Sequence, residues 1–314
     1  MADAGLPTYD ELPEVPGIGM RHAWDVWGRD DVLGSINLVT AARVAAARAE
    51  IVTGVRYSLD LPLDLPDPPL YGRRPYLRQV RPLNRHEMDD HLDDFHPQGS
   101  TQWDALGHVR CREHGYWGGR TQDPTEGPNG LGIHHWTRHG IAGRGILLDV
   151  EAWLAAHDPT YDPLEPRPIT VEDLQATLAA QRVAPTVGDL WCVRTGWVRA
   201  YRTLGADRRA AYAIEPRFAG LQADEAMARF LWDAHPAALL CDNPAVERAP
   251  GDPAVGSLHR RLLPLLGFAL GEMFDFDSLA AACAADRRWT FFFVAAPLHV
   301  PDGLGSPGNA MAIR

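Results

Sequence analysis

HPQGSTQWDALGH, residues 96–108, is the stretch on which the fold assignment of this chain depends. Its polar residues stand two and four positions apart, as in a metal-binding loop, yet Gln98 and Gln102 occupy positions where histidines are typical. If the segment is extended, alternation puts Gln98, Gln102 and Asp104 on one side, so that they converge on one point. A polar loop whose side chains cap neighbouring backbone groups has the same spacing, and both interpretations stay open at this stage.

A second polar pair flanks the apolar stretch LHRRLLPLLGFALGE, residues 258–272. His259 and Glu272 border sequence that is typical of a core, where an unpaired polar group costs several kcal/mol. We therefore expect them to be partners of each other or of the segment at 96–108.

Length and composition indicate a globular protein. The chain has 314 residues, of which 46% are hydrophobic, enough for a sizeable core. We expect residues 1–16, which are acidic and Pro-rich, to be a flexible segment, and residues 17–314 to form a single domain. No apolar run is long enough for a membrane span and no leader pattern is present, so we expect a cytoplasmic protein that binds no membrane.

Charge and cysteine content argue against a nucleic-acid-binding protein, a zinc ribbon and a disulfide-rich domain. The net charge is −11, and all 30 basic residues are Arg, which argues against binding to nucleic acid because a phosphate backbone needs a basic face. The four cysteines lie far apart without a CxxC pair, and we interpret them as buried thiols rather than as a zinc ribbon or a disulfide framework.

Strand and helix patterns alternate irregularly along the chain, which predicts an α/β fold with a mixed sheet. The predicted strands are 55–61, 145–150, 190–193, 237–241 and 289–296. The predicted helices begin after Thr40, after Thr170 with a capping box to Asp173, and within 223–234, 258–266 and 277–284. The Pro-rich segment 61–76 is interpreted as a long surface loop, suited to a lid or a subunit contact.

Several other motifs are interpreted as structural. Residues 85–96 contain His86, His91, His96 and four aspartates, a composition more typical of a solvated acidic loop than of a metal site. His134, His135 and His139 point in different directions if their segment is regular. GLGSPG at 303–308 fits GxGxxG, but no helix can follow it, so we interpret it as a turn. The chain has no GxSxG elbow and no P-loop, which leaves acid-base or metal-assisted chemistry.

The chain resembles the cyclase family that includes bacterial kynurenine formamidase and isatin hydrolase. QGSTQWDALGH aligns without a gap to the family's HxGTHxDxxxH motif, and the likeness continues from about residue 17 to the C-terminus. Further blocks are DVWGRDDVLGSINLVTAARV (25–44), GRGILLDV (143–150), GDLWCVRTGW (188–197), residues 258–272 and PLHVPDGLGSPGNAMAI (297–313). The resemblance implies a swivelling β/β/α fold and a homodimer or homotetramer with sites near subunit contacts.

The resemblance also implies a site. Typical members hold one or two divalent ions through two histidines and an aspartate of the motif, with a later His and Glu. These positions are Gln98, Gln102, Asp104, His259 and Glu272 here, and His108 takes the acid-base position. An amide oxygen binds zinc more weakly than imidazole does, so zinc affinity should fall. We expect either no cofactor or one divalent cation (Mn, Zn or Mg) on Asp104, His259 and Glu272, with both glutamines as weak donors.

The function expected from these residues is acid-base catalysis on a small oxygenated or cyclic metabolite. One reaction is hydrolysis of an amide or lactone, the other dehydration or ring closure, with Asp104, His108, His259 and Glu272 as catalytic groups. Substrate contacts are expected from Gln98, Thr101, Gln102, Trp103 and Tyr116, of which Trp103 or Tyr116 would pack against a substrate ring. A metal-dependent amidohydrolase and a non-catalytic binding protein are the alternatives.

Overall fold

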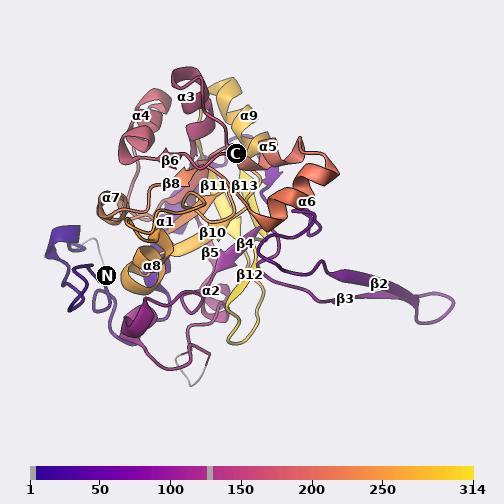
Figure 1. Ribbon diagram of the computed structural model, residues 1–314, viewed down its shortest axis with the longest axis horizontal. Helices are drawn as coiled ribbons and strands as arrows, with labels where there is room; N and C mark the ends of the chain where they lie inside the picture. Colours follow the sequence, from indigo (N-terminus) through magenta and orange to yellow (C-terminus); the bar gives the residue numbers. More distant parts are fainter. Residues whose placement is uncertain (1–4, 126–129) are drawn as a thin grey trace.

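The fold is that of a computed structural model, which describes residues 5–125 and 130–314. Its centre is a nine-stranded sheet in the order β1-β13-β11-β5-β7-β9-β10-β4-β12 (Figure 1). The strands, in chain order, are β1 (Arg56–Ser58), β4 (Gln102–Asp104), β5 (Ile141–Asp149), β7 (Leu190–Arg194), β9 (Ala238–Cys241), β10 (Ala269–Glu272), β11 (Thr290–Ala295), β12 (Gly305–Pro307) and β13 (Ala310–Ile313). Two small sheets add β2 (Leu77–Pro82) with β3 (Met88–Asp93), and β6 (Pro168–Ile169) with β8 (Gly220–Leu221).

The middle of the sheet is parallel and its margins are antiparallel. Strands β5, β7, β9 and β10 run parallel, while β4 and β12 on one side, and β11, β13 and β1 on the other, pair antiparallel. All residues of β7, β9 and β10 are buried, as expected for parallel strands covered on both faces. The predicted α/β class with a mixed sheet is confirmed, as are the five predicted strands within a few residues.

The helices pack around this sheet. They are α1 (Ala41–Ala47), α2 (His134–His139), α3 (Val150–His157), α4 (Val171–Gln181), α5 (Trp197–Arg202), α6 (Ala206–Ile214), α7 (Glu225–Ala234), α8 (Leu258–Arg261) and α9 (Asp277–Asp286), with short 3-10 and π turns η1 (Tyr9–Glu11), η2 (Gly34–Leu38), η3 (Arg48–Glu50), η4 (Arg112–His114), η5 (Trp117–Gly119) and η6 (Leu262–Leu266). Both expected caps are present, at Thr40 and in the Thr170–Asp173 capping box. No described helix is long and apolar enough to cross a bilayer.

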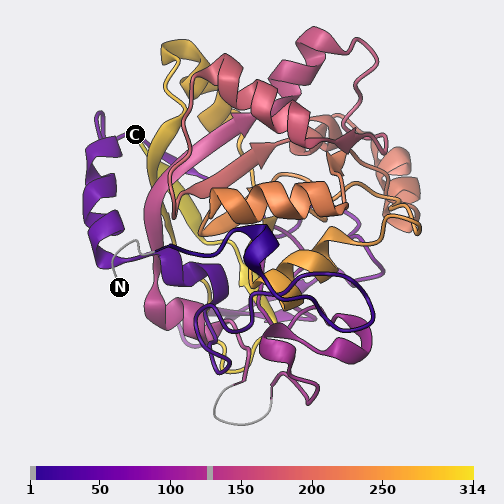
Figure 2. The same ribbon diagram turned by 90° about the vertical axis from the view of Figure 1, so that its left-hand side faces the viewer.

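The N-terminal segment packs onto the body of the protein instead of extending from it. Tyr9, Leu12 and Val15 are buried in the main core. The backbone N–H of Tyr9 donates to Asp233, and the Trp232 indole donates to the carbonyl of Pro7, which ties η1 to α7 (Figure 2). Acidic and proline residues predicted a flexible segment at 1–16; within it, the side chains of Tyr9, Leu12 and Val15 bury apolar surface in the core. Residues 1–4 of that prediction lie outside the described residues.

The predicted acidic loop at 85–96 is wrong, because much of it forms strand β3. Strands β2 and β3 make a hairpin that extends away from the body, with every residue exposed (Figure 1). Pairs such as Arg78–Asp90 and Gln79–Asp93 bridge its strands. A strand with no buried face has no apolar alternation, so the sequence pattern could not reveal it.

The predicted turn at GLGSPG is also partly wrong. Gly305–Pro307 form the edge strand β12, which pairs with β4. A Cβ at Gly305 would lie 2.7 Å from the Trp103 carbonyl oxygen, so the close approach of the two backbones requires glycine here. The GxGxxG match at 303–308 is therefore not a dinucleotide-binding motif, because a strand begins at Gly305 where that motif requires a helix.

Candidate active site

The two polar stretches that the sequence singled out converge at one point. Strand β4 pairs with β10 so that Gln102 lies opposite Glu272, and Asp104 follows two residues later on the same face. Helix α8 brings His259 to this face. One ligand atom each of Asp104, His259 and Glu272 lies within 4.8 Å of the others, and we call these three residues the acid–imidazole cluster.

Short polar contacts link the cluster to Gln102. The Gln102 Nε2 atom donates to Glu272 Oε2 at 2.6 Å and, more weakly, to Asp104 Oδ1 at 3.4 Å. The His259 Nε2 atom lies 2.9 Å from Glu272 Oε1 and 3.7 Å from Asp104 Oδ2. The expected partnership of His259 with Glu272 is therefore present, and Gln102 joins it from the neighbouring strand.

Glu247 completes the surroundings of His259, and sequence reasoning missed it. Its Oε2 atom lies 2.6 Å from His259 Nδ1, and its Oε1 atom accepts from the Ser257 hydroxyl at 2.8 Å. A carboxylate behind an imidazole fixes the orientation of the ring and increases its basicity. Glu247 lies in the loop after β9, and no motif or spacing in the sequence pointed to it.

The pKa values of the two carboxyl groups in the cluster are shifted in opposite directions. Burial raises the pKa of Glu272, as does the charge of Asp104, to about 7 despite the hydrogen bond from His259. Burial also acts to raise the pKa of Asp104, but the charges of His108 and His259 outweigh it, and the pKa is lowered. Two neighbouring carboxyl groups whose pKa values shift in opposite directions are suited to opposite roles in proton transfer.

His259 is stabilised in its protonated form. Burial acts to lower its pKa, but the charge of Glu247 and the hydrogen bonds with Asp104, Glu247 and Glu272 raise it well above the usual value. The same contacts lower the pKa of Glu247 against the effect of burial. The cluster therefore holds an imidazolium between carboxylates when no other cation is bound.

His108 lies at the rim of the cluster. Its Nε2 atom is 3.8 Å from Asp104 Oδ1, and its side chain is 30% exposed whereas that of Asp104 is 1% exposed. This partial exposure leaves the imidazole accessible to a substrate or to water, with a buried carboxylate beside it. The position fits the acid-base role that the resemblance implies.

Gln98 and Thr101 lie near the cluster without joining it. Gln98 is packed against Gly305, the residue that pairs with Asp104, and it has no hydrogen bond to the cluster within the described residues. The Thr101 hydroxyl accepts from the backbone N–H of Leu61 and donates to the carbonyl of Met273. Thr101 thus connects the Pro-rich loop to the end of β10, a structural task that occupies its hydroxyl.

Trp103, which was predicted to contact the substrate, points away from the acid–imidazole cluster. Alternation along β4 turns its ring to the face opposite Gln102 and Asp104, where it is fully buried and its indole donates to the Gly308 carbonyl. Trp136, Phe274 and Phe293 meet it edge-on. Tyr116 has the Arg110 guanidinium over its ring and no described contact with the cluster.

A separate cavity of about 290 Å³ lies between the Pro-rich loop and residues 95–101. Ser100, Thr101, Phe95 and Pro66 are among its lining residues, whereas Asp104, His259 and Glu272 are not. The cavity is therefore distinct from the acid–imidazole cluster.

The cluster fits a divalent cation. One imidazole and two carboxylates are a common ligand set, and the contact of His259 Nδ1 with Glu247 is the usual support of a metal-binding histidine. The Gln102 Oε1 atom is buried without a hydrogen-bond partner, so an oxygen donor is available beside the same carboxylates. Of the two glutamines considered as weak donors, Gln102 is hydrogen-bonded to the cluster, whereas Gln98 lies against Gly305, the residue that pairs with Asp104.

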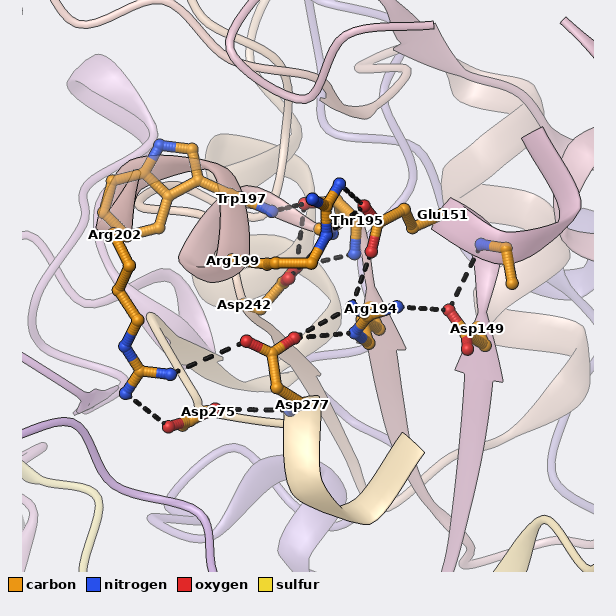
Figure 3. Close-up of polar contacts among 12 residues, drawn as sticks. Asp149, Glu151, Arg194, Thr195, Trp197, Arg199, Arg202, Asp242, Asp275 and Asp277 are labelled. Carbon is orange, nitrogen blue, oxygen red and sulfur yellow. Dashed lines mark hydrogen bonds and ion pairs between the residues drawn. The ribbon is translucent and has the colours of Figure 1, made fainter. Parts of the chain in front are cut away.

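A second polar network closes the carboxyl ends of β5, β7 and β9 (Figure 3). Arg194 pairs with Asp149, Glu151 and Asp277, and Glu151 also pairs with Arg199. Asp242 accepts from the backbone N–H groups of Thr195 and Gly196 and from the Thr195 hydroxyl. Since its charges are paired internally, we interpret this network as support for the loop that follows β9.

That loop carries Glu247. Next to Asp242, the side-chain amide of Asn243 donates to the carbonyls of Ala219 and Val246, and the backbone carbonyl of Asn243 accepts from the Met273 N–H. The network in Figure 3 thus fixes the start of the segment that places Glu247 behind His259.

Comparison with known proteins finds chains with a similar sequence and a similar fold. The model of the Cyclase family, described as "Putative cyclase", matches residues 56–248. A crystal structure described as a novel cyclase is 30% identical, with a TM-score of 0.82, over 93% of this chain and 99% of that one. Isatin hydrolase A from Labrenzia aggregata, bound to benzyl benzoate, is 16% identical with a TM-score of 0.59, over 88% and 98% of the two chains. Isatin hydrolase A from Ralstonia solanacearum is 16% identical with a TM-score of 0.57, over 87% and 95%. No curated protein matches the chain.

Proposed function

This chain belongs to the cyclase family, and we propose that it is a hydrolase that opens an amide or lactone bond in a small oxygenated or cyclic metabolite. The observation that carries the proposal is the convergence of Asp104, His259 and Glu272 within 4.8 Å, from β4, α8 and β10. A buried group of this kind costs free energy to assemble, which favours a role in catalysis over a role in stability.

The residues take distinct roles in the proposed reaction. His108, partly exposed and beside Asp104, accepts a proton from the water that attacks the substrate carbonyl. Glu272, with its raised pKa, returns a proton to the leaving nitrogen or oxygen. The imidazolium of His259 supplies positive charge near the developing oxyanion, held in place by Glu247.

A divalent cation is compatible with the same residues. Asp104, His259 and Glu272 would hold it, with Gln102 as a further oxygen donor, and the bound ion would polarise the carbonyl and lower the pKa of water. Ring closure or dehydration would use the same acid and base without such an ion. We favour hydrolysis because the similar structures with a described activity are isatin hydrolases, a likeness that supports the fold and only suggests the reaction.

The test is hydrolysis of a panel of lactones, cyclic amides and N-formyl anilines by the purified protein, with and without added Mn²⁺, Zn²⁺ or Mg²⁺. We expect turnover of at least one class, lowered about 100-fold or more by His108→Ala and by Glu272→Gln. His86→Ala, on the exposed hairpin, is the matched control and should keep wild-type rates. Unchanged rates in both site variants, with their folds intact, would remove these residues from the mechanism.

A further inference from the structure

Two residues with strained backbones lie next to the carboxylates that contact His259. Val246, which precedes Glu247, has a φ of +52°, and Met273, which follows Glu272, has a φ of +54°. Both residues are buried. The left-handed region is costly for a residue with a side chain, most of all for a β-branched one such as valine, and such strain persists only where the surrounding structure holds it. The contacts that hold these two backbones therefore also place the two carboxylates.

One fully buried residue, Asn243, is hydrogen-bonded to both strained segments. Its side-chain Nδ2 atom donates to the Val246 carbonyl at 3.2 Å and to the Ala219 carbonyl at 2.8 Å. Its backbone carbonyl accepts from the Met273 N–H at 3.1 Å. Both partners of the Nδ2 atom are acceptors, so the position needs the two N–H donors of a short amide.

Other contacts hold each strained segment from its far side. The Val246 carbonyl also accepts from the Leu221 N–H at 2.9 Å, and the Met273 carbonyl accepts from the Thr101 hydroxyl at 2.6 Å. Those two donors belong to different parts of the sheet. Among these contacts, Asn243 is the residue that the two segments share.

The contacts of His259 depend closely on where the two carboxylates lie. Its Nδ1 atom is 2.6 Å from Glu247 Oε2, and its Nε2 atom is 2.9 Å from Glu272 Oε1. A displacement of about 1 Å would lengthen either contact beyond a hydrogen bond. The relative position of the loop after β9 and the end of β10 therefore decides whether the imidazole keeps both partners.

We propose that Asn243 is a positioning residue, which holds Glu247 and Glu272 on opposite sides of His259 by joining the loop after β9 to the end of β10. The inference rests on the proposed function, in which His259 supplies positive charge near the oxyanion. The backbone contact of Asn243 with the end of β10 is made whatever side chain stands there, so its amide is the group that fixes Glu247. Loss of the amide should therefore act on catalysis through Glu247.

The first test detects the contact between His259 and Glu247 without turnover. An imidazole N–H in a short hydrogen bond to a carboxylate gives a proton NMR signal far downfield of the amide region. We expect this signal in the wild type, assigned by its upfield shift in Glu247→Gln. In Asn243→Ala the signal should be lost or broadened, because Glu247 is no longer held against the ring.

Ser35→Ala is the matched control. The buried Ser35 hydroxyl donates to the Ala237 carbonyl at 2.7 Å and accepts from the Ala269 N–H at 2.9 Å, so it joins β9 and β10 at their opposite ends. This variant loses a comparable buried bridge between the same two strands, far along them from the carboxylates. It should keep the downfield signal and the wild-type kcat.

The second test is a double-mutant cycle in kcat. Asn243→Ala should lower kcat about tenfold with a smaller change in KM, as is usual for a residue that orients another one. The double variant Asn243→Ala/Glu247→Gln should be no slower than Glu247→Gln alone, because the amide acts through that carboxylate. A purely structural role would instead give losses that multiply.

An unchanged downfield signal in Asn243→Ala would overturn the inference, as would absence of the signal from the wild type or multiplicative losses in the cycle. Circular dichroism and thermal unfolding establish that each variant is folded, and the milder Asn243→Ser replaces Asn243→Ala in both tests if the latter does not fold. Failure of the proposed function is distinguishable. A signal that depends on Asn243, without hydrolysis of any panel substrate, would contradict the hydrolase and keep the positioning role. Hydrolysis with a signal that does not depend on Asn243 would do the reverse.

Discussion

The Nδ1 atom of His259 lies 2.6 Å from the Oε2 atom of Glu247, and the backbone N–H of His259 donates to the same oxygen at 2.9 Å. One carboxylate therefore fixes both the start of α8 and the direction of the imidazole. With Nδ1 occupied, Nε2 is left to face Asp104 and Glu272.

Removal of this carboxylate should impair catalysis more than folding. We expect Glu247→Gln to lower kcat about 10–100-fold with a smaller change in KM, because His259 loses the charge that orients and protonates it. Steady-state kinetics and thermal unfolding measure the two effects. Glu165→Gln, which removes a surface partner of Arg217, is the control. A variant that loses stability but keeps kcat would show that Glu247 serves only the fold.

A histidine at position 102 should strengthen zinc binding. Gln102 lies opposite Glu272 and reaches both carboxylates of the cluster, so Gln102→His adds an imidazole beside Asp104, His259 and Glu272. We expect zinc affinity to rise at least about tenfold, measured by competition with a chelator. Gln175→His, at an exposed position of α4, should leave it unchanged. Adding Gln98→His should contribute less than Gln102→His, since Gln102 already hydrogen-bonds both carboxylates of the cluster whereas Gln98 contacts Gly305. Equal affinity in Gln102→His and wild type would place the zinc elsewhere.

Trp103 should matter for stability and not for substrate selection. Its ring is fully buried among Trp136, Phe274 and Phe293, on the face of β4 away from the cluster. Trp103→Ala should lower the free energy of unfolding by about 3–5 kcal/mol, measured by urea denaturation. Trp103→Phe should cost less and keep KM. Trp153→Ala, on the partly exposed side of α3, is a milder control. A change of KM in a stable Trp103→Phe variant would argue for a substrate contact.

Asp242 should make stability depend on pH. Burial raises its pKa to about 7 from the usual 3.8, against the charge of Arg194 and the hydrogen bonds from Thr195 and Gly196. The folded protein then binds this proton more tightly than the unfolded chain does. The contribution is complete below about pH 4 and is lost as the pH rises towards about 7.

The pH dependence of wild-type stability is compared with that of Asp242→Asn, because the asparagine amide does not titrate. The free energy of unfolding of wild type minus that of Asp242→Asn should fall between about pH 4.5 and pH 7.5, as measured by chemical denaturation. The lost acceptor in the variant adds a constant offset that does not change this slope. Asp207→Asn, on exposed helix α6, should show no such trend. A difference that rises with pH would mean that Asp242 is stabilised as the carboxylate.

Much of the fold could be predicted from local patterns. The buried runs at 145–150, 190–193 and 237–241 predicted the central strands, because strands covered on both faces carry uninterrupted apolar residues. The helix caps at Thr40 and Thr170 could also be predicted, because a cap depends on residues only a few positions apart in the sequence. The β2–β3 hairpin was not, since neither of its faces is buried, and β12 was hidden by glycines needed for close backbone approach.

The candidate site likewise contains residues that the sequence could predict and one that only the tertiary structure places there. The sequence alone determined that Gln102, Asp104, His108, His259 and Glu272 are the groups to consider, because strand alternation and a cyclase-like motif depend only on residue order. Only the tertiary structure decided which other groups meet them. Glu247 lies in the loop after β9, whose start is fixed by the hydrogen bonds of Asp242 and Asn243, and no local pattern encodes such long-range placement. The same register that gathers the carboxylates turns Trp103 into the core, since successive side chains on a strand point to opposite faces.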